Sequence, residues 1–158
     1  MTKTTGTAAT VRAGDGRSVR WGPGGIVRVV AGADTTDSAF SIVESIEPPG
    51  SAAPLHVHHG EAEGFYVVEG EIELTCGDDT LTAGPGDFVY TPKDVPHKYA
   101  VVGDRQARVL LFFSRPGFES FFLDAGSPLD EPAVPPDPER MLSVIARYDM
   151  ELLEAPGH

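Results

Sequence analysis

Three side chains in the stretch GSAAPLHVHHGEAEGFYVVEG, residues 50–70, have the types and spacing of a metal site. His56 and His58 are two residues apart, so on a β-strand their imidazoles project from the same side. Glu63 follows five residues after His58, beyond the glycine-containing run 59–62. Two imidazoles and a carboxylate suit a divalent first-row transition metal. The spacing therefore predicts metal binding in this stretch.

A fourth candidate ligand, His97, lies 34 residues beyond Glu63, at the start of a predicted strand. Pro92 and Pro96 precede it and restrict the backbone, so they fix where that strand begins. A ligand needs such a fixed position. We therefore consider His97 together with the first three side chains.

Three other residues near this stretch also carry groups that bind metals. His59 points away from the side shared by His56 and His58, so we expect it at the surface or beside a ligand. Glu61 is a rival to Glu63 for the carboxylate position, but it lies in the expected turn. Cys76, the single cysteine, is in phase with the apolar residues of its strand, which predicts a packed core thiol.

Short strand patterns recur through the first two thirds of the chain, and turn residues separate them every 6–12 residues. Runs of β-branched or alternating apolar residues lie at 18–21, 26–30, 40–46, 65–68, 71–76, 80–82, 88–91, 98–102 and 108–113. No helix-period segment interrupts them. The pattern predicts an all-β barrel or sandwich.

The composition changes after residue 115. Residues 116–123 are compatible with a short helix, and the five prolines of 126–138 predict an extended connector. Asp137 as N-cap, followed by Pro138, predicts a helix from about 138 to 153 whose apolar stripe covers the barrel or a partner subunit. We therefore divide the chain into a flexible N-terminal segment (1–17), a β-barrel (18–115) and a C-terminal extension (116–158).

The charge balance excludes some classes of partner. The chain has 12 Lys and Arg against 24 Asp and Glu, a net charge of −12. Contact with nucleic acid or with anionic lipid needs a basic surface, so we expect neither. The first residues have no apolar signal-peptide core, and no apolar run approaches the roughly 18 residues that span a bilayer. These features predict a cytoplasmic protein of one domain.

The two histidine-containing stretches resemble the two sequence motifs of the cupin family. The residues that match in type and spacing are Gly50, His56, His58, Glu63 and Gly70 in the first motif and Gly86, Pro92 and His97 in the second. Asp94 stands where the second motif usually has glycine, and aspartate tolerates a left-handed backbone better than most residues. Val101 stands where the motif usually has an asparagine that is not a ligand.

The resemblance implies a double-stranded β-helix (jelly-roll) barrel with a C-terminal helical extension. Within it, His56, His58, Glu63 and His97 would bind one divalent transition metal ion: Mn, Fe, Co, Ni, Cu or Zn. Four protein ligands leave one or two positions open on a five- or six-coordinate ion, and open positions permit catalysis.

Residues 56–70 and the tail 137–153 are similar to the small, single-domain, quercetin 2,3-dioxygenase-like cupins. This likeness implies a metal-dependent dioxygenase that uses O2 and acts on a flavonol-like or enol-bearing aromatic substrate. Glu63 would accept the enol proton as catalytic residue, aided by a pKa that an apolar pocket can raise.

The pocket walls can be assigned only by strand parity. Phe65 and Val67 share parity with Glu63, and Tyr99 shares parity with His97, so we expect all three inside the barrel. Phe88 and Tyr90 share one face of their strand, but parity does not say which face. These five are candidate pocket residues, with core packing as the alternative role. Together they predict apolar and aromatic walls. No basic cluster accompanies the histidines in the sequence, which argues against a phosphorylated substrate.

Two other classes of function fit the same residues. One is a non-redox metal-dependent isomerase, cyclase or lyase in small-molecule biosynthesis; the other is a non-catalytic binding module. We also expect a homodimer, because sheet edges left open by a barrel need cover.

Overall fold

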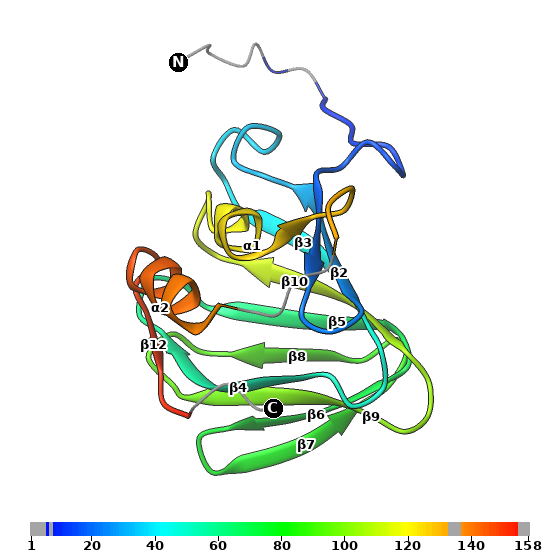
Figure 1. The fold of residues 1–158 in the computed structure, drawn as a ribbon, viewed down its shortest axis with the longest axis vertical. Helices are drawn as coiled ribbons and strands as arrows, with labels where there is room; N and C mark the ends of the chain where they lie inside the picture. Colours follow the sequence, from blue (N-terminus) through cyan, green and yellow to red (C-terminus); the bar gives the residue numbers. More distant parts are fainter. Residues whose placement is uncertain (1–5, 7, 133–136, 155–158) are drawn as a thin grey trace.

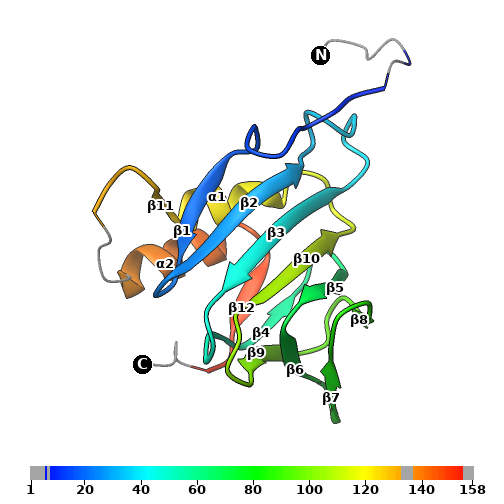
Figure 2. The same cartoon turned by 90° about the vertical axis from the view of Figure 1, so that its right-hand side faces the viewer.

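The computed structural model describes residue 6, residues 8–132 and residues 137–154, and its body is two antiparallel sheets (Figure 1). The larger sheet contains, in spatial order, β11 (Ser127–Pro128), β1 (Ser18–Trp21), β2 (Gly25–Ala31), β3 (Ser41–Glu47), β10 (Ala107–Phe113), β5 (Glu63–Glu69) and β8 (Phe88–Thr91). The smaller contains β12 (Met150–Leu152), β4 (Ala52–His58), β9 (His97–Val102), β6 (Glu71–Cys76) and β7 (Asp79–Ala83). Figure 2 shows β1, β2, β3, β10 and β5 side by side.

Alternation along the strands separates the core from the surface. In β6, Ile72 and Leu74 are fully buried, whereas Glu71 and Glu73 between them are exposed. Val43 of β3 and Val67 of β5 are also fully buried. Apolar side chains from both sheets thus fill one shared core, which confirms the predicted all-β barrel with a small helical extension.

Two turns need a left-handed backbone. Gly70, between β5 and β6, has φ 74°, and a Cβ there would lie 2.4 Å from the carbonyl oxygen of Gln106, so only glycine fits. Asp94, between β8 and β9, has φ 65°. The chain therefore keeps the left-handed turn where the cupin motif usually has glycine, as expected of aspartate.

Two helices of the C-terminal extension, α1 (Glu119–Ala125) and α2 (Pro138–Ala146), lie together on one side of the sheets (Figure 1). The Asp137 side chain accepts hydrogen bonds from the backbone N–H groups of Glu139 and Arg140, which confirms the predicted N-cap. None of the helices among the described residues is long and apolar enough to cross a membrane.

The predicted extension of the second helix to residue 153 is wrong. The helix ends at Ala146, and Asp149 adopts φ 52°. The chain then forms β12, which pairs antiparallel with β4 and places Met150 opposite His58 and Leu152 opposite His56. The extension thus completes the sheet that carries the two histidines.

Candidate metal centre

Strands of both sheets bring the four candidate ligands together. His56 and His58 lie on β4, His97 is opposite His56 at the start of β9, and Glu63 begins β5 in the other sheet. One donor atom from each residue lies within 4.8 Å of all the others. Nε2 of His56 is 3.2 Å from Nε2 of His58, and Oε2 of Glu63 is 3.0 Å from Nε2 of His97 and 3.3 Å from Nε2 of His58.

The outer nitrogen of each imidazole has a hydrogen-bond acceptor. Nδ1 of His56 donates to the carbonyl oxygen of Pro54 at 2.7 Å, and Nδ1 of His97 donates to that of Val95 at 3.1 Å. Nδ1 of His58 is 2.6 Å from a carboxylate oxygen of Glu61. Because these acceptors keep a proton on Nδ1, each imidazole in its neutral form presents the lone pair of Nε2 to the centre.

The donor set fits a metal ion. A metal ion requires neutral imidazoles, whose Nε2 atoms are acceptors like the carboxylate oxygen. Such atoms repel at 3.0–3.3 Å unless a cation or a proton lies between them. Two donors bound side by side to one ion, each about 2.1 Å from it, lie about 3 Å apart. The cluster could therefore hold one transition metal ion.

Burial and mutual charge shift the titration of this cluster in the metal-free protein. Burial disfavours the imidazolium of His58, but the carboxylates of Glu61 and Glu63 outweigh it and raise the His58 pKa to about 9. Burial and the neighbouring imidazoles lower the pKa of His56 to about 4. Burial favours neutral Glu63, yet hydrogen bonds from His58 and His97 lower its pKa to about 2. The expected raised pKa of Glu63 is thus corrected, since its partners outweigh the apolar surroundings.

The sequence reasoning considered Glu61 only as a rival metal ligand and missed its contact with His58. Its side chain is fully buried and holds His58 through Nδ1. Its other oxygen has no hydrogen-bond partner in the described part of the chain, and the nearest cation is Nη1 of Arg115 at 3.7 Å. Arg115 passes directly over Gly60, where a Cβ would lie 2.5 Å from Nη1. The position of Glu61 three residues after His58 could have indicated their contact, but its place in the expected turn argued against burial.

His59 lies outside the site. Its exposed ring contacts Asp94 at 2.8 Å and Glu151 of β12 at 3.3 Å. His59 therefore links the turn before β9 to the C-terminal strand. Cys76 is half-buried and packs against the core.

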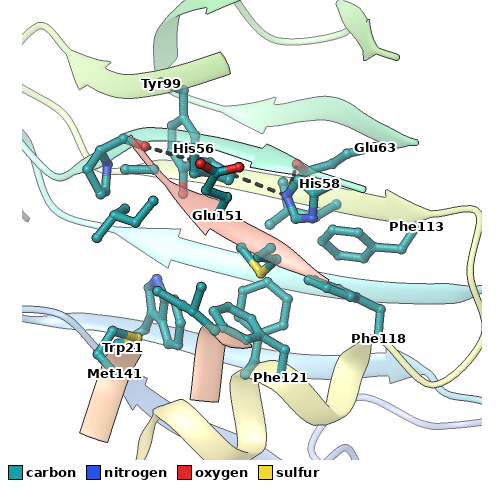
Figure 3. A pocket seen from close by; sticks show the side chains of 17 residues that line it. Trp21, His56, His58, Glu63, Tyr99, Phe113, Phe118, Phe121, Met141 and Glu151 are labelled. Atoms are coloured by element: carbon teal, nitrogen blue, oxygen red, sulfur yellow. Dashed lines mark hydrogen bonds and ion pairs between the residues drawn. The ribbon is translucent and has the colours of Figure 1, made fainter. Parts of the chain in front are cut away.

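A cavity of about 160 Å³ adjoins the donor atoms (Figure 3). The cupin-like strands contribute the polar end, and β1, α1, α2 and β12 contribute much of the remaining wall. Its lining is Trp21, Ala53, Pro54, His56, His58, Glu63, Tyr99, Leu111, Phe113, Phe118, Phe121, Phe122, Met141, Ile145, Met150, Glu151 and Leu152. None of these described residues is a lysine or an arginine.

The structure separates the five candidate pocket residues. Tyr99 lines the cavity and donates a 2.5 Å hydrogen bond to buried Glu47. Phe65 and Val67 are fully buried in the core and are not among the lining residues; the ring of Phe65 packs against Tyr99.

The placement of Phe88 and Tyr90 in the pocket is corrected. Their side chains are 58% and 60% exposed on the outer face of β8. Phe88 lies over Gly64, where a Cβ would be 2.7 Å from its ring. The strand alternates as expected, with Val89 and Thr91 as its buried residues, so the aromatic face is the outward one.

Comparison with known proteins gives consistent matches. Residues 43–113 match the model of the Cupin domain family. Quercetin 2,3-dioxygenase of Bacillus subtilis (strain 168) is 29% identical over 133 residues, which are 80% of this chain and 39% of that protein. Polyketide synthase CurC of Streptomyces cyaneus is 31% identical over 70 residues, 44% of this chain and 46% of that protein.

Solved structures show the same similarity. A mutant of Bacillus subtilis oxalate decarboxylase superposes with a TM-score of 0.59 and 27% identity over 67% of this chain and 29% of that chain. This chain thus spans less than half the length of each of these three relatives. The family match, the barrel and the clustered histidines place residues 43–113 of this chain in the cupin superfamily.

Proposed function

We propose that this chain is a metal-dependent dioxygenase that acts on a flavonol-like or enol-bearing aromatic substrate. The supporting observation is an apolar, aromatic cavity that is lined by His56, His58 and Glu63, three of the four clustered candidate ligands. The similarity to quercetin 2,3-dioxygenase agrees with this substrate class.

The charge of the cavity separates this proposal from its closest competitor. Oxalate is a small dianion, and oxalate decarboxylase is one of the relatives described above. The charged side chains of the described lining, apart from the histidines, are the carboxylates of Glu63 and Glu151. An apolar wall without a cationic side chain favours a neutral, flat molecule over a dianion.

Each polar residue has a role in this proposal. His56, His58, Glu63 and His97 would hold the ion, whose chemistry is to bind the enol oxygen of the substrate and to promote its reaction with O2. Glu63 is ionised at neutral pH in the metal-free protein, where hydrogen bonds from His58 and His97 lower its pKa to about 2. Because this carboxylate is a weak base, it would accept the enol proton only from an enol whose own pKa the bound ion lowers. The aromatic walls orient the substrate ring and keep water away from it.

Oxygen uptake tests the proposal. Purified protein is loaded separately with Mn, Fe, Co, Ni, Cu and Zn, and uptake is followed with quercetin, with smaller enolic aromatics and with oxalate. We expect uptake with an enolic aromatic and at least one redox-active metal, and none after His97→Ala. The absence of uptake across the whole panel would refute the dioxygenase.

The similarity to a polyketide synthase protein favours a second candidate, a non-redox isomerase, cyclase or lyase of small-molecule biosynthesis that uses the ion as a Lewis acid. Product formed under nitrogen would select this candidate. Tight binding of an aromatic ligand without any product would instead select a non-catalytic binding module.

We also propose a cytoplasmic homodimer. β8 is an edge strand with exposed Phe88 and Tyr90, and the ring of Phe88 packs against Phe112 of β10, which is 36% exposed. An aromatic face beside an open sheet edge is a surface that a second copy can cover. Light scattering tests the dimer, and a monomer at micromolar concentration would contradict it.

A further inference from the structure

The residues that line the cavity differ in how deeply they are buried. His58, Glu63, Leu111, Phe113, Phe118 and Ile145 are buried. Glu151 is exposed, and several other lining residues are only half-buried: Trp21, Ala53, Pro54, His56, Tyr99, Met141, Met150 and Leu152. His58 and Glu63 are thus at the buried end of the cavity, whereas His56 is half-buried, and Trp21 and Met141 mark the part of the mouth that lies away from His58 and Glu63. In Figure 3, Trp21 and Met141 lie together, away from His58 and Glu63.

The cavity is small for the substrate class proposed above. Its volume is about 160 Å³. An apolar protein cavity of about 150 Å³ holds a single benzene. A flavonol has a fused bicyclic head, which carries the enol, and a separate phenyl ring. With the enol head beside the ligands, the phenyl ring has to lie at the mouth.

Both residues at the mouth are held in place by defined contacts. The ring of Trp21 packs against Phe121 at 5.7 Å and Phe122 at 5.0 Å between ring centroids. Met141 lies in the first turns of α2, whose start is fixed by the Asp137 cap. Arg140 next to it donates to the backbone oxygens of Asp124 and Gly126, which ties α2 to the end of α1.

We infer that Trp21 and Met141 form a subsite for the ring of the substrate farthest from the metal ligands. A rigid indole and an adaptable thioether are side chains that hold an aromatic ring well. Both lie outside residues 43–113, so segments added to the cupin domain set the size of the substrate. This inference rests on the proposed function, because it assumes that the enol head lies beside the ligands.

Two ligands that differ by one phenyl ring test the subsite. 3-Hydroxyflavone has the phenyl ring, and 3-hydroxychromone has the same enol head without it. Binding to the zinc-loaded protein is measured by calorimetry under nitrogen, so no turnover interferes. Met141→Ala is expected to weaken 3-hydroxyflavone about tenfold and to change 3-hydroxychromone by less than about twofold, since truncation removes contacts to the phenyl ring alone.

Leu142 provides a matched control. It is the next residue of α2 but is 54% exposed and does not line the cavity, so Leu142→Ala is expected to leave both affinities unchanged. Met141→Leu keeps the bulk and should stay within about twofold of the wild type for both ligands, which separates lost contact from a loosened helix. Equal losses for the two ligands in Met141→Ala, or no loss for 3-hydroxyflavone, would overturn the subsite.

The outcomes also separate this inference from the proposed function. Binding of 3-hydroxyflavone that depends on Met141, without oxygen uptake by any metal-loaded form, keeps the subsite and removes the dioxygenase. Oxygen uptake that is indifferent to Met141→Ala keeps the dioxygenase and removes the subsite. Failure of 3-hydroxyflavone to bind the wild-type protein removes both.

Discussion

His58 differs from the other two candidate imidazole ligands in the group that holds its outer nitrogen. His56 and His97 donate to backbone carbonyl oxygens, which no substitution removes, whereas His58 depends on the side chain of Glu61. Partners that orient a ligand and raise its basicity are usually worth a factor of 10–100 in metal affinity. The centre is therefore most open to perturbation at Glu61.

Glu61→Ala is expected to lower the affinity for Co²⁺ or Zn²⁺ by about 10–100-fold. The alanine leaves Nδ1 of His58 without its acceptor, while the four donor residues remain. Competition titration with a chelating dye gives the affinity. The control is Glu71→Ala, which removes an exposed carboxylate of β6 that does not line the cavity. An equal loss in both variants would mean that negative charge, and not the contact with His58, is what Glu61 supplies.

The pH dependence of metal affinity follows from the protonation of His58. In the metal-free protein the His58 pKa is raised to about 9, so His58 carries a proton at neutral pH. A metal ion has to displace that proton, and the affinity should rise about tenfold per pH unit below pH 9 and level off above it. The contacts of protonated His58 with Glu61 and Glu63 also stabilise the metal-free fold. This contribution is fully present below pH 6.5 and is lost as the pH rises through about 9. Titrations between pH 6.5 and 9.5 measure the slope, and an affinity independent of pH would show that His58 is already neutral.

At the residue scale, the sequence predicts the four candidate ligands but not their surroundings. The ligands follow from fixed spacings on strands. The burial of Glu61 against His58 was not predicted, because a turn residue becomes buried only when Arg115 and the chain after β10 cover it. The outward position of Phe88 and Tyr90 could not be predicted either. Alternation defines the two faces of a strand, but only the packing of the sheets decides which face is inside.

At the scale of elements, local signals predicted the strands and the start of α2, and tertiary contacts decided the rest. The apolar stripe beyond Ala146 continued at helical spacing, but residues 150–152 pair with β4 instead. Edge-strand pairing satisfies backbone groups on β4 that a longer helix would leave open. Long-range pairing of this kind has no signature within the segment itself.

The turn before His97 leads to a prediction about stability at this scale. Asp94 has φ 65°, so Asp94→Gly is expected to keep the free energy of unfolding within about 0.5 kcal/mol, even though the contact with exposed His59 is lost. Asp94→Val introduces a β-branched residue into the left-handed region and should cost about 1–3 kcal/mol. Urea denaturation of the metal-free protein measures both. Equal stability of the valine and glycine variants would show that the turn relaxes.

At the scale of the whole molecule, the candidate ligands connect the two sheets. His56, His58 and His97 belong to the five-stranded sheet, and Glu63 belongs to the seven-stranded one. An ion held by all four would join the sheets directly, and the unfolded chain offers no such arrangement. Metal binding should therefore appear as stability of the entire fold.

Metal at about one hundred times its dissociation constant is expected to stabilise the fold by about 2.7 kcal/mol. For a chain of 158 residues this corresponds to a rise in Tm of about 5–10 °C. Calorimetry of the metal-free protein, with and without added Zn²⁺, measures the shift, and a chelator should reverse it. His97→Ala should still fold without metal, because apolar side chains from both sheets form the core, but it should lose most of the shift. A shift of the same size in this variant would mean that the ion binds elsewhere, and a variant unable to fold would mean that His97 supports the barrel itself.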